Sequence, residues 1–406
     1  MVPIFWMATE DHDREEIDHA WINGSKITWP GEAAGAVGRM PLQGIGAVLK
    51  EVDMALGPGN NADRLRQILH SCYRPEFTLV QATRLFVNEL FGRFGIVCLD
   101  ADDVSLKRLF VPQMRSELLN GLTRKAIAPT MQQLAERYRV QANSREINLF
   151  LLSEKKRERV IELRNGDLAI DDTDRRLRRE ELVEELEHHP DRFSPNVLLR
   201  PLYQETILPN IAYIGGGGEL AYWLQLRSLF AEARLSMPVL LLRSSVAIVP
   251  KKEVERARDL GLSIPDLFKP KNDLERKIAL ERAGFSSGMT GEREELKGFY
   301  DRLAARAASI DPTLERSAGS AAHLAFKGIE ALEKRFIRAA KRKVTTDLHR
   351  LQMVLDTLFP GGGLQERRDN VMTFYIRKGE RFFDELLDQL DPLDEKFTVL
   401  IDDPGM

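Results

Sequence analysis

The sequence predicts an α/β fold in which a doubly wound sheet is followed by an antiparallel α-helical coiled coil. Short apolar strand segments alternate with helical segments over residues 1–250, the pattern of a parallel or mixed sheet. Beyond Pro250 the chain becomes charged and helical, with apolar residues near 4-3 spacing between Leu314 and Leu358. At 406 residues the chain exceeds the usual size of one core, so two or three structural units are expected.

Composition indicates a globular protein with no general attraction to nucleic acid or membranes. The net charge is -3, with 43% hydrophobic and 30% charged residues. The two cysteines, Cys72 and Cys98, form no disulfide framework or CxxC motif, so we expect a cytoplasmic, reducing location. We also expect no signal peptide and no membrane span, because no window approaches about 20 apolar residues.

Polar residues follow directly on the first predicted strand, Val2–Ala8. Residues just past the carboxyl end of a strand line the ligand crevice of an open α/β sheet, which makes Asp11, His12 and Asp13 candidate catalytic residues. Glu10 shares this position. Three interpretations stay open: the acids cap a helix beginning near Asp13, they serve acid/base chemistry, or histidine and carboxylate bind a metal. Our overall expectation includes no metal.

The next segments continue the alternation. Ile22–Trp29 is predicted as a short strand or hairpin, residues 41–93 as a helical insertion, and Gly95–Leu99 as a buried strand. A long helical stretch runs from Val104 to about Val140. Strands return from Arg145, with Asn165-Gly166 as a hairpin turn, and a polar helix follows at Arg178–His188.

The stretch Arg200–Phe230 concentrates the chemically informative residues. Ile207–Ile214 is predicted as a strand and Glu219–Phe230 as a helix, separated by a turn of Gly215, Gly216, Gly217 and Gly218. Such a turn leaves backbone N–H groups free to bind an anion or nucleotide. A plain tight turn remains the alternative, because Leu220 replaces the third glycine of the dinucleotide fingerprint and no Gly-Lys-Ser/Thr follows.

Polar residues on either side of this turn are candidates for substrate binding. They are Arg200, Tyr203, Gln204 and Glu205 before the strand, and Arg243 after the next predicted strand, Val239–Leu242. Another short strand is predicted at Val246–Val249.

The helical part is predicted to fold back on itself. Pro312, with Asp311 as its cap, begins a helix that continues to about Leu358, roughly 70 Å at 1.5 Å per residue. Asn272–Ala308, interrupted near 284–291, is the expected antiparallel arm. A cluster of lysines and arginines between 327 and 343 is interpreted as a solvated face, with a phosphate or nucleotide site as the alternative. Because an apolar seam favours self-association, we expect a homodimer.

A second glycine turn, Phe359–Gly363, precedes another polar group. Gln365, Glu366 and Arg367 are candidates for anion or nucleotide binding, at a second site or as part of one site built from distant segments. A final helix at Asp369–Leu390 and a strand at Phe397–Ile401 are expected to return to the globular part.

Several long segments together resemble the bacillithiol biosynthesis cysteine-adding enzyme family. They are FWMATEDHDREEIDHAWI, REINLF, RPLYQETILPNIAYIGGGGELAYW and FPGGGLQER, which occur in order over nearly the whole chain. The resemblance implies a Rossmann-like domain (1–40 and 94–250), a helical connecting peptide (41–93), a dimerising coiled coil (251–358) and a return segment (359–406). It also implies a segment before the FW-EDHD strand, so we expect this chain to be a fragment or to have a misassigned start.

The resemblance implies a carbon-nitrogen ligase that adds L-cysteine to glucosaminyl malate to form bacillithiol. Joining a carboxylate to an amine requires activation, for which ATP is the obvious reagent, although no Walker lysine supports it. His12 or Asp13 would deprotonate the amine, and Arg200 or Arg243 would hold the malate carboxylates. The alternatives are a nucleotidyl or adenylyl transferase acting on another small acceptor, and a non-catalytic coiled-coil assembly protein.

Overall fold

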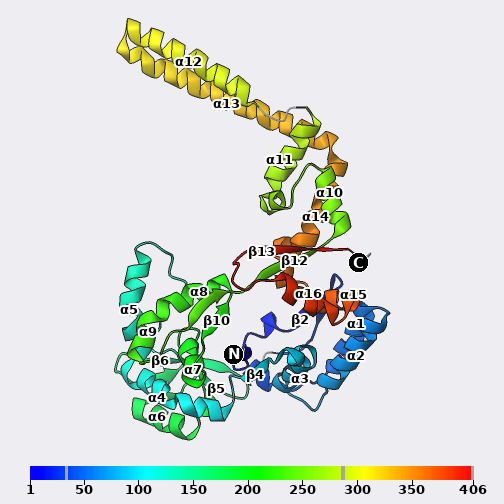
Figure 1. The fold of residues 1–406 in the computed structure, drawn as a ribbon. Coiled ribbons are helices and arrows are strands. Elements are labelled where there is room, and N and C mark those ends of the chain that lie inside the picture. The colour runs from blue at the N-terminus through cyan, green and yellow to red at the C-terminus, as the bar shows by residue number, and fades with distance from the viewer. Residues whose placement is uncertain (33–34, 285–288, 404–406) are drawn as a thin grey trace. The chain divides into compact units, whose positions relative to one another are not determined.

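The computed structural model of the protein describes residues 1–32, 35–284 and 289–403 (Figure 1). The chain divides into two compact units. The first comprises Met1–Ser245 with Asp369–Phe397, and the second comprises Val246–Arg368 with the residues from Thr398 onward. Each unit has its own secondary structure and is described separately.

Two parallel strand pairs form the α/β part of the first unit. Strand β1 (Ile4–Met7) pairs with β4 (Val97–Asp100), and β10 (Ala212–Gly215) pairs with β11 (Val239–Leu242). In both pairs the partners are joined through helices, as parallel strands require. Parallel pairing and helical crossovers agree with the α/β class that the alternating pattern predicts.

An antiparallel sheet adds five strands in the order β8-β7-β6-β5-β9. Their bounds are Leu149–Leu152 for β5, Arg157–Glu162 for β6, Leu168–Ile170 for β7, Arg176–Leu177 for β8 and Phe193–Pro195 for β9. The Asn165-Gly166 turn between β6 and β7 is confirmed, with Gly166 at φ 89° and its N–H bonded to the Leu163 carbonyl at 2.9 Å. The sheet packs its apolar face into the main core.

Helices surround this core, which includes the fully buried Phe110, Phe193 and Trp223. They are α4 (Val104–Asn120), α5 (Leu122–Ala135), α6 (Arg179–His188), α7 (Arg200–Ile207), α8 (Gly217–Trp223) and α9 (Arg227–Glu232). The helix expected to run from Val104 to Val140 breaks at Gly121, whose φ of 61° ends α4 with a left-handed cap. The strand expected from Ile207 starts only at Ala212, because helix α7 buries Leu202 and Tyr203 and continues to Ile207.

The helix expected near Asp13 is absent from the described N-terminal residues. One 3-10 turn, η1 (Arg14–Glu16), leads instead into a hairpin of β2 (His19–Ile22) and β3 (Ser25–Thr28). Asp13 makes no capping hydrogen bond, and the Arg14 guanidinium is tied to the Trp29 and Glu32 carbonyls at 2.8 and 2.7 Å. The hairpin forms because Asn23-Gly24 supplies two positive φ values, 49° and 80°.

The insertion consists of α1 (Ile45–Leu56), α2 (Asn60–Cys72) and α3 (Leu79–Phe91). The last helices of the chain, α15 (Met372–Lys378) and α16 (Arg381–Gln389), pack against it. The Asn61 amide donates to the Ile376 carbonyl at 3.3 Å, and the rings of Phe91 and Phe383 lie 4.8 Å apart. Residues 359–406 therefore do not return to the globular part as a whole: residues 369–397 join the first unit, whereas β13 (Phe397–Asp402) pairs with β12 (Ser245–Pro250).

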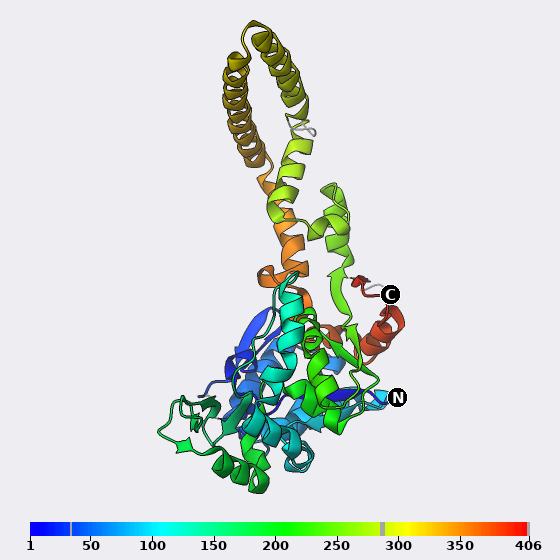
Figure 2. The same cartoon turned by 90° about the vertical axis from the view of Figure 1, so that its left-hand side faces the viewer.

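The second unit is mainly helical, with α10 (Lys251–Asp259), α11 (Lys271–Arg282), α12 (Thr290–Ile310), α13 (Pro312–Lys343) and α14 (Thr345–Leu358). Helices α12 and α13 run side by side in opposite directions (Figures 1 and 2), which confirms the coiled coil. The Asp311 carboxylate caps α13 by accepting from the Thr313 N–H at 2.8 Å. The single long helix expected to reach Leu358 is broken at Val344, where the apolar spacing slips.

A buried carboxylate joins three helices of this unit. Glu333 of α13 accepts hydrogen bonds from Arg276 of α11 at 2.6 Å and from Arg293 of α12 at 2.7 Å. Burial alone would raise the pKa of Glu333, but the two guanidinium groups outweigh burial and lower it. Glu333 is therefore charged at neutral pH and holds the start of the coiled coil together.

We predict that Glu333→Gln lowers the free energy of unfolding of the second unit by about 1–3 kcal/mol, because two guanidinium groups lose their shared anion. Chemical denaturation followed by circular dichroism measures this change. Glu330→Gln is the matched control, since Glu330 is exposed and its oxygen lies 3.8 Å from Arg293. Equal effects of the two substitutions would contradict the assignment.

Candidate active site

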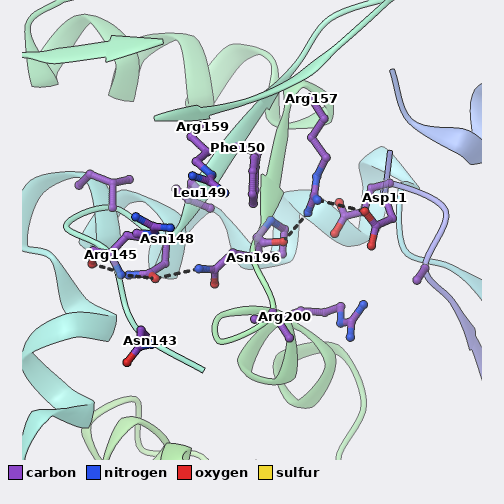
Figure 3. A pocket seen from close by; sticks show the side chains of 15 residues that line it. Asp11, Asn143, Arg145, Asn148, Leu149, Phe150, Arg157, Arg159, Asn196 and Arg200 are labelled. Atoms are coloured by element: carbon purple, nitrogen blue, oxygen red, sulfur yellow. Dashed lines mark hydrogen bonds and ion pairs between the residues drawn. The ribbon is translucent and has the colours of Figure 1, made fainter. Parts of the chain in front are cut away.

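A cavity of about 320 Å³ lies within the first unit, beyond the carboxyl end of β1 (Figure 3). Its wall combines the end of β1, the segment before β5, strands β5 and β6, and the segment that leads into α7. The polar lining residues are Glu10, Asp11, Asn143, Arg145, Asn148, Arg157, Arg159, Asn196 and Arg200. Of the residues predicted from sequence, Asp11 and Arg200 are brought together here.

The cavity lining carries an excess of positive charge, with four arginines against two acids. Arg145 and Arg159 are exposed, and neither they nor Arg200 pairs with a carboxylate within the described parts of the chain. Arg157 pairs with Asp11 at 3.2 Å. A cavity with this balance favours an anionic ligand, and guanidinium groups suit carboxylate or phosphate oxygens.

Arg157 is the most firmly held of these cations. Its guanidinium donates to the Ser194 hydroxyl at 3.0 and 3.1 Å and to the Pro195 carbonyl at 3.1 Å, and it lies 4.0 Å from the centre of the Phe150 ring. Burial lowers the pKa of Arg157, partly offset by the nearby Asp11. Figure 3 shows Arg157 directed towards Asp11, so these residues form one rigid wall.

Asp11 is a charged carboxylate. Its Oδ1 accepts from the His12 backbone N–H at 2.8 Å and from Arg157 at 3.2 Å. Burial alone would raise its pKa, but Arg157 and the His12 N–H outweigh burial and lower the pKa of Asp11. A carboxylate of lowered pKa is a weak base, so Asp11 is better suited to orient a cationic group than to accept a proton.

Arg200 stands in the first turn of α7 and donates to the Tyr222 hydroxyl at 3.2 Å. Burial would lower its pKa, but Tyr222, Tyr213 and Glu10 outweigh burial and raise the pKa of Arg200. The helix that carries it is capped by Asn196, whose Oδ1 accepts from the Leu198 and Leu199 N–H groups at 3.0 and 3.1 Å. Arg200 is therefore a positioned cation available to a ligand.

A fully buried carboxylate, Glu117 of α4, fixes this wall from behind. Its two oxygens accept from the N–H and hydroxyl of Thr123 at 2.7 and 2.8 Å, and from the N–H and amide of Asn148 at 2.9 and 2.8 Å. The Asn148 Oδ1 in turn accepts from Asn196 at 2.8 Å, as the dashed line in Figure 3 marks. The chain of contacts thus runs from Glu117 to the cap of the helix that bears Arg200.

Glu10 is the other buried acid of the cavity. Its side chain is 3% exposed, and its Oε2 lies 3.1 Å from Nζ of Lys107, which is 1% exposed. Lys107 donates to Asp102 at 2.7 Å, and Asp102 also accepts from Arg39 at 2.9 Å. The contact with Lys107 is an ion pair without hydrogen-bond geometry, so neither Glu10 oxygen accepts a hydrogen bond.

His12 and Asp13, predicted as catalytic, lie outside the cavity lining. The His12 side chain is 52% exposed, and its Nδ1 lies 3.2 Å from Asp11 and 3.4 Å from Arg157. Asp13 is exposed. His12 is therefore next to cavity residues, whereas Asp13 is directed to solvent.

Three predicted substrate-binding residues of α7 have other partners or positions. Tyr203 is fully buried, donates to the Ala101 carbonyl at 2.9 Å and packs edge-on against Trp6, so it is a core residue. Glu205 is buried and accepts from the Asn210 amide at 2.6 Å, which closes the end of α7. Gln204 is half-buried and does not line the cavity. The proposed ligand contacts of Tyr203 and Glu205 are thus corrected, because helix periodicity turns them to the core.

The glycine turn is not part of the cavity lining either. The Gly216 N–H donates to Glu219 at 2.8 Å, so a carboxylate already caps α8. Gly215 is required for packing, because a Cβ there would lie 2.6 Å from the Tyr213 ring. Arg243 is exposed and follows β11, with its N–H bonded to the Gly215 carbonyl at 2.9 Å. Anion binding by Gly215–Gly218 and Arg243 remains a prediction.

In the second unit, Gln365 and Glu366 serve the backbone of β12. The Gln365 side chain exchanges hydrogen bonds with the Ile248 N–H and carbonyl at 2.8 and 3.0 Å, and Glu366 accepts from the Val246 N–H at 3.0 Å. Arg367 is exposed. These contacts give Gln365 and Glu366 a structural role, and nucleotide binding at this segment remains a prediction.

Sequence reasoning missed Arg157, Asn148 and Asn196. Arg145 and Asn148 belong to the REINLF segment, so that segment carried a usable signal. Asn196 precedes α7 at a capping position, which a search for helix caps finds. Arg157 lies in the run KKRER, where local sequence does not distinguish a cavity arginine from solvated ones.

Fold and cavity together define the class of the protein: a Rossmann-like α/β protein with a cationic cavity and a coiled-coil arm. The chain belongs to the bacillithiol biosynthesis BshC family. The family's N-terminal Rossmann-like domain matches residues 1–244, and its C-terminal coiled-coil domain matches residues 246–401.

Curated relatives extend over nearly the whole chain. A protein of Flavobacterium johnsoniae named "Putative cysteine ligase BshC" is 40% identical over 98% of this chain and 75% of its own length. Proteins of the same name from Christiangramia forsetii and Bacillus mycoides are 39% and 27% identical, over 98% of this chain and 75% and 77% of their own lengths. The resemblance inferred from the four sequence segments is thereby confirmed.

Within residues 1–32, 35–284 and 289–403, no helix combines the length and hydropathy needed to cross a bilayer. Nor do His, Cys, Asp and Glu side chains in these ranges form a group that could hold a metal ion.

We predict that Glu117→Gln lowers the free energy of unfolding by about 2–4 kcal/mol, because the new amide NH2 must face two donors in a dry site. Thermal or urea denaturation measures the loss. Glu146→Gln is the matched control, since Glu146 is 53% exposed in a surface pair with Arg124. A loss for Glu117→Gln no larger than that of the control would show that the four contacts are not formed.

Proposed function

We propose that the protein is a carbon-nitrogen ligase of bacillithiol biosynthesis that joins L-cysteine to the amine of glucosaminyl malate. The observation that supports it most directly is the cationic cavity of a chain in this family, with Arg200 unpaired by any carboxylate in the described residues. The names of the relatives support the ligase class.

The malate part of the acceptor fits the charge of the cavity. It carries two carboxylates, and a guanidinium can bind each of them through two parallel hydrogen bonds. Arg200 is the first candidate because it is positioned by a capped helix and lacks an anionic partner. Arg145 and Arg159, exposed at the cavity, add attraction for the same anion.

Amide formation from a free carboxylate and an amine is uphill in water, so the cysteine carboxyl must be activated. We propose ATP as the activating reagent, which would supply a phosphate or adenylate leaving group. The chain's own residues would bind and orient the acceptor and exclude water. The Gly215–Gly218 turn fits ATP only in part, because Glu219 occupies the Gly216 N–H.

For the assembly we propose a homodimer formed through the α12–α13 coiled coil, in the cytoplasm, without nucleic acid or membrane partners. Exposed apolar side chains on these helices, among them Phe299, Leu324 and Phe336, offer the contact surface.

Product formation tests the proposed function. The protein is mixed with cysteine and glucosaminyl malate, with and without ATP, and bacillithiol is measured by mass spectrometry; a form extended by its upstream codons is assayed in parallel. Product that requires cysteine supports the ligase. Turnover of a nucleotide without cysteine would indicate a nucleotidyl or adenylyl transferase, and neither product nor ligand-induced stabilisation would indicate a non-catalytic protein.

We predict that Arg200→Met raises the KM for glucosaminyl malate about 10- to 100-fold and changes the KM for cysteine little, because a charged hydrogen bond to the malate carboxylates is lost. Steady-state kinetics with each substrate varied measures both constants. Arg115→Met is the matched control, since Arg115 is 54% exposed in a surface pair with Glu187. An unchanged KM for glucosaminyl malate would remove Arg200 from the site.

A further inference from the structure

We propose that Glu10 is the catalytic base of the ligation, taking a proton from the ammonium group of glucosaminyl malate before the amine attacks the activated cysteine carboxyl. This inference rests on the proposed function and assigns a residue to the proton transfer within it. Three observations carry it: the position of Glu10, its free lone pairs and the charges behind it.

The position of Glu10 is fixed by the end of the first strand pair. Strand β1 ends at Met7, opposite Asp100 of β4, and the neighbouring Thr9 is buried with its hydroxyl bonded to Asp100. The turn that follows is closed by the Asp11 N–H, which donates to the Ala8 carbonyl at 3.2 Å. Glu10 is therefore a lining residue of the cavity on rigid backbone, as a catalytic group requires.

Both oxygens of Glu10 are buried and neither accepts a hydrogen bond from the described residues. Buried carboxylates normally have all their oxygens satisfied, as those of Glu117 are. An unsatisfied carboxylate costs free energy and persists where function requires it. Glu10 can accept a proton without first breaking a hydrogen bond.

The charges around Glu10 allow it to change its protonation state. Lys107 approaches it at 3.1 Å but donates to Asp102 at 2.7 Å, so Lys107 keeps a partner when Glu10 becomes neutral. The other charged or titratable groups that face it are Arg39, Asp102, Asp11, Arg157, Arg200 and Tyr203.

The pKa of Glu10 agrees with this role. Burial raises it, Lys107 and Arg157 act against burial, and the net direction is upward. A carboxylate with a raised pKa is a stronger base, closer to the pKa of the ammonium that it must deprotonate. Asp11, next in the sequence, has a lowered pKa, so the two adjacent acids are driven apart in basicity.

The proton and electron balance is simple. The Glu10 carboxylate takes one proton from the ammonium, which leaves a neutral amine and a neutral carboxylic acid. The amine lone pair then forms the N–C bond to the activated cysteine carbonyl, and the C–O bond to the phosphate or adenylate leaving group breaks with its electron pair. The nitrogen loses its second proton to the leaving group or to water, which completes the amide.

The first test compares Glu10→Gln with the unaltered protein over a range of pH. We expect kcat to fall about 100- to 10,000-fold near neutral pH, with the KM for glucosaminyl malate changed less than about threefold. The deficit should shrink as pH rises, because water then supplies more of the neutral amine. A deficit that is constant with pH would indicate a structural role and overturn the proposal.

A second variant separates catalysis from the charge left on Lys107. In Glu10→Gln with Lys107→Met the interior charges are again balanced, since Asp102 keeps Arg39. We expect this double variant to fold, to be stabilised by glucosaminyl malate in a thermal shift, and to remain as slow as Glu10→Gln. Recovery of kcat in the double variant would show that only the ion pair matters.

The remaining arms identify failure elsewhere. Glu253→Gln is the matched control, because Glu253 is equally buried at 4% exposure but pairs with Arg256 on α10 of the second unit, and its kcat should be unchanged. If His12→Ala, and not Glu10→Gln, gives the pH-dependent deficit, His12 is the base and Glu10 is not. If the unaltered protein makes no bacillithiol with ATP, the proposed function fails independently of Glu10.

Discussion

The carboxylate of Glu117 is the constraint on which the cavity depends. Four donors from two other segments converge on it, so α4, the start of α5 and the start of β5 can adopt only one mutual arrangement. Asn148 extends that arrangement to Asn196, and Asn196 sets where α7 begins. The direction of the Arg200 side chain is thus decided by a residue that never reaches the cavity. An anion in a dry interior is tolerated because every lone pair is used, which makes the arrangement both stable and specific.

Around the cavity the protein treats its charges in two ways. Glu117 and Arg157 are fully engaged and act as supports, whereas Glu10 and Arg200 keep hydrogen-bonding capacity in buried or half-buried positions. The first group adds to stability, and the second group lowers it. Such local inconsistency is expected where a site must bind a polar ligand, because groups that are already satisfied have nothing left to offer. The two acids after β1 show the same division, since one carboxylate is held by a guanidinium and the other is not.

Much of the fold could be predicted because its signals are local. Asn165-Gly166 fixes a hairpin by backbone conformation alone, and the 4-3 spacing after Pro312 requires a helical partner. The predicted strand at Ile207 was wrong because an apolar, β-favouring run also suits a helix that buries one face. In the site, Asp11 and Arg200 followed from their position after secondary-structure elements. Tyr203 and Glu205 were misassigned because residues three and five positions along a helix face a different neighbour, and Arg157 was missed because only tertiary contacts distinguish it from its charged neighbours.

Arg200 occupies the first turn of α7, where the helix dipole presents its positive end. A guanidinium there is repelled by the peptide dipoles as well as by Arg157 nearby. An anion that binds between them relieves both repulsions at once, so part of its binding free energy is strain already stored in the folded chain. Ligand occupancy and conformational stability are consequently linked quantities: the acceptor acts as a folding cofactor, and the resistance of the protein to unfolding follows the supply of its own substrate.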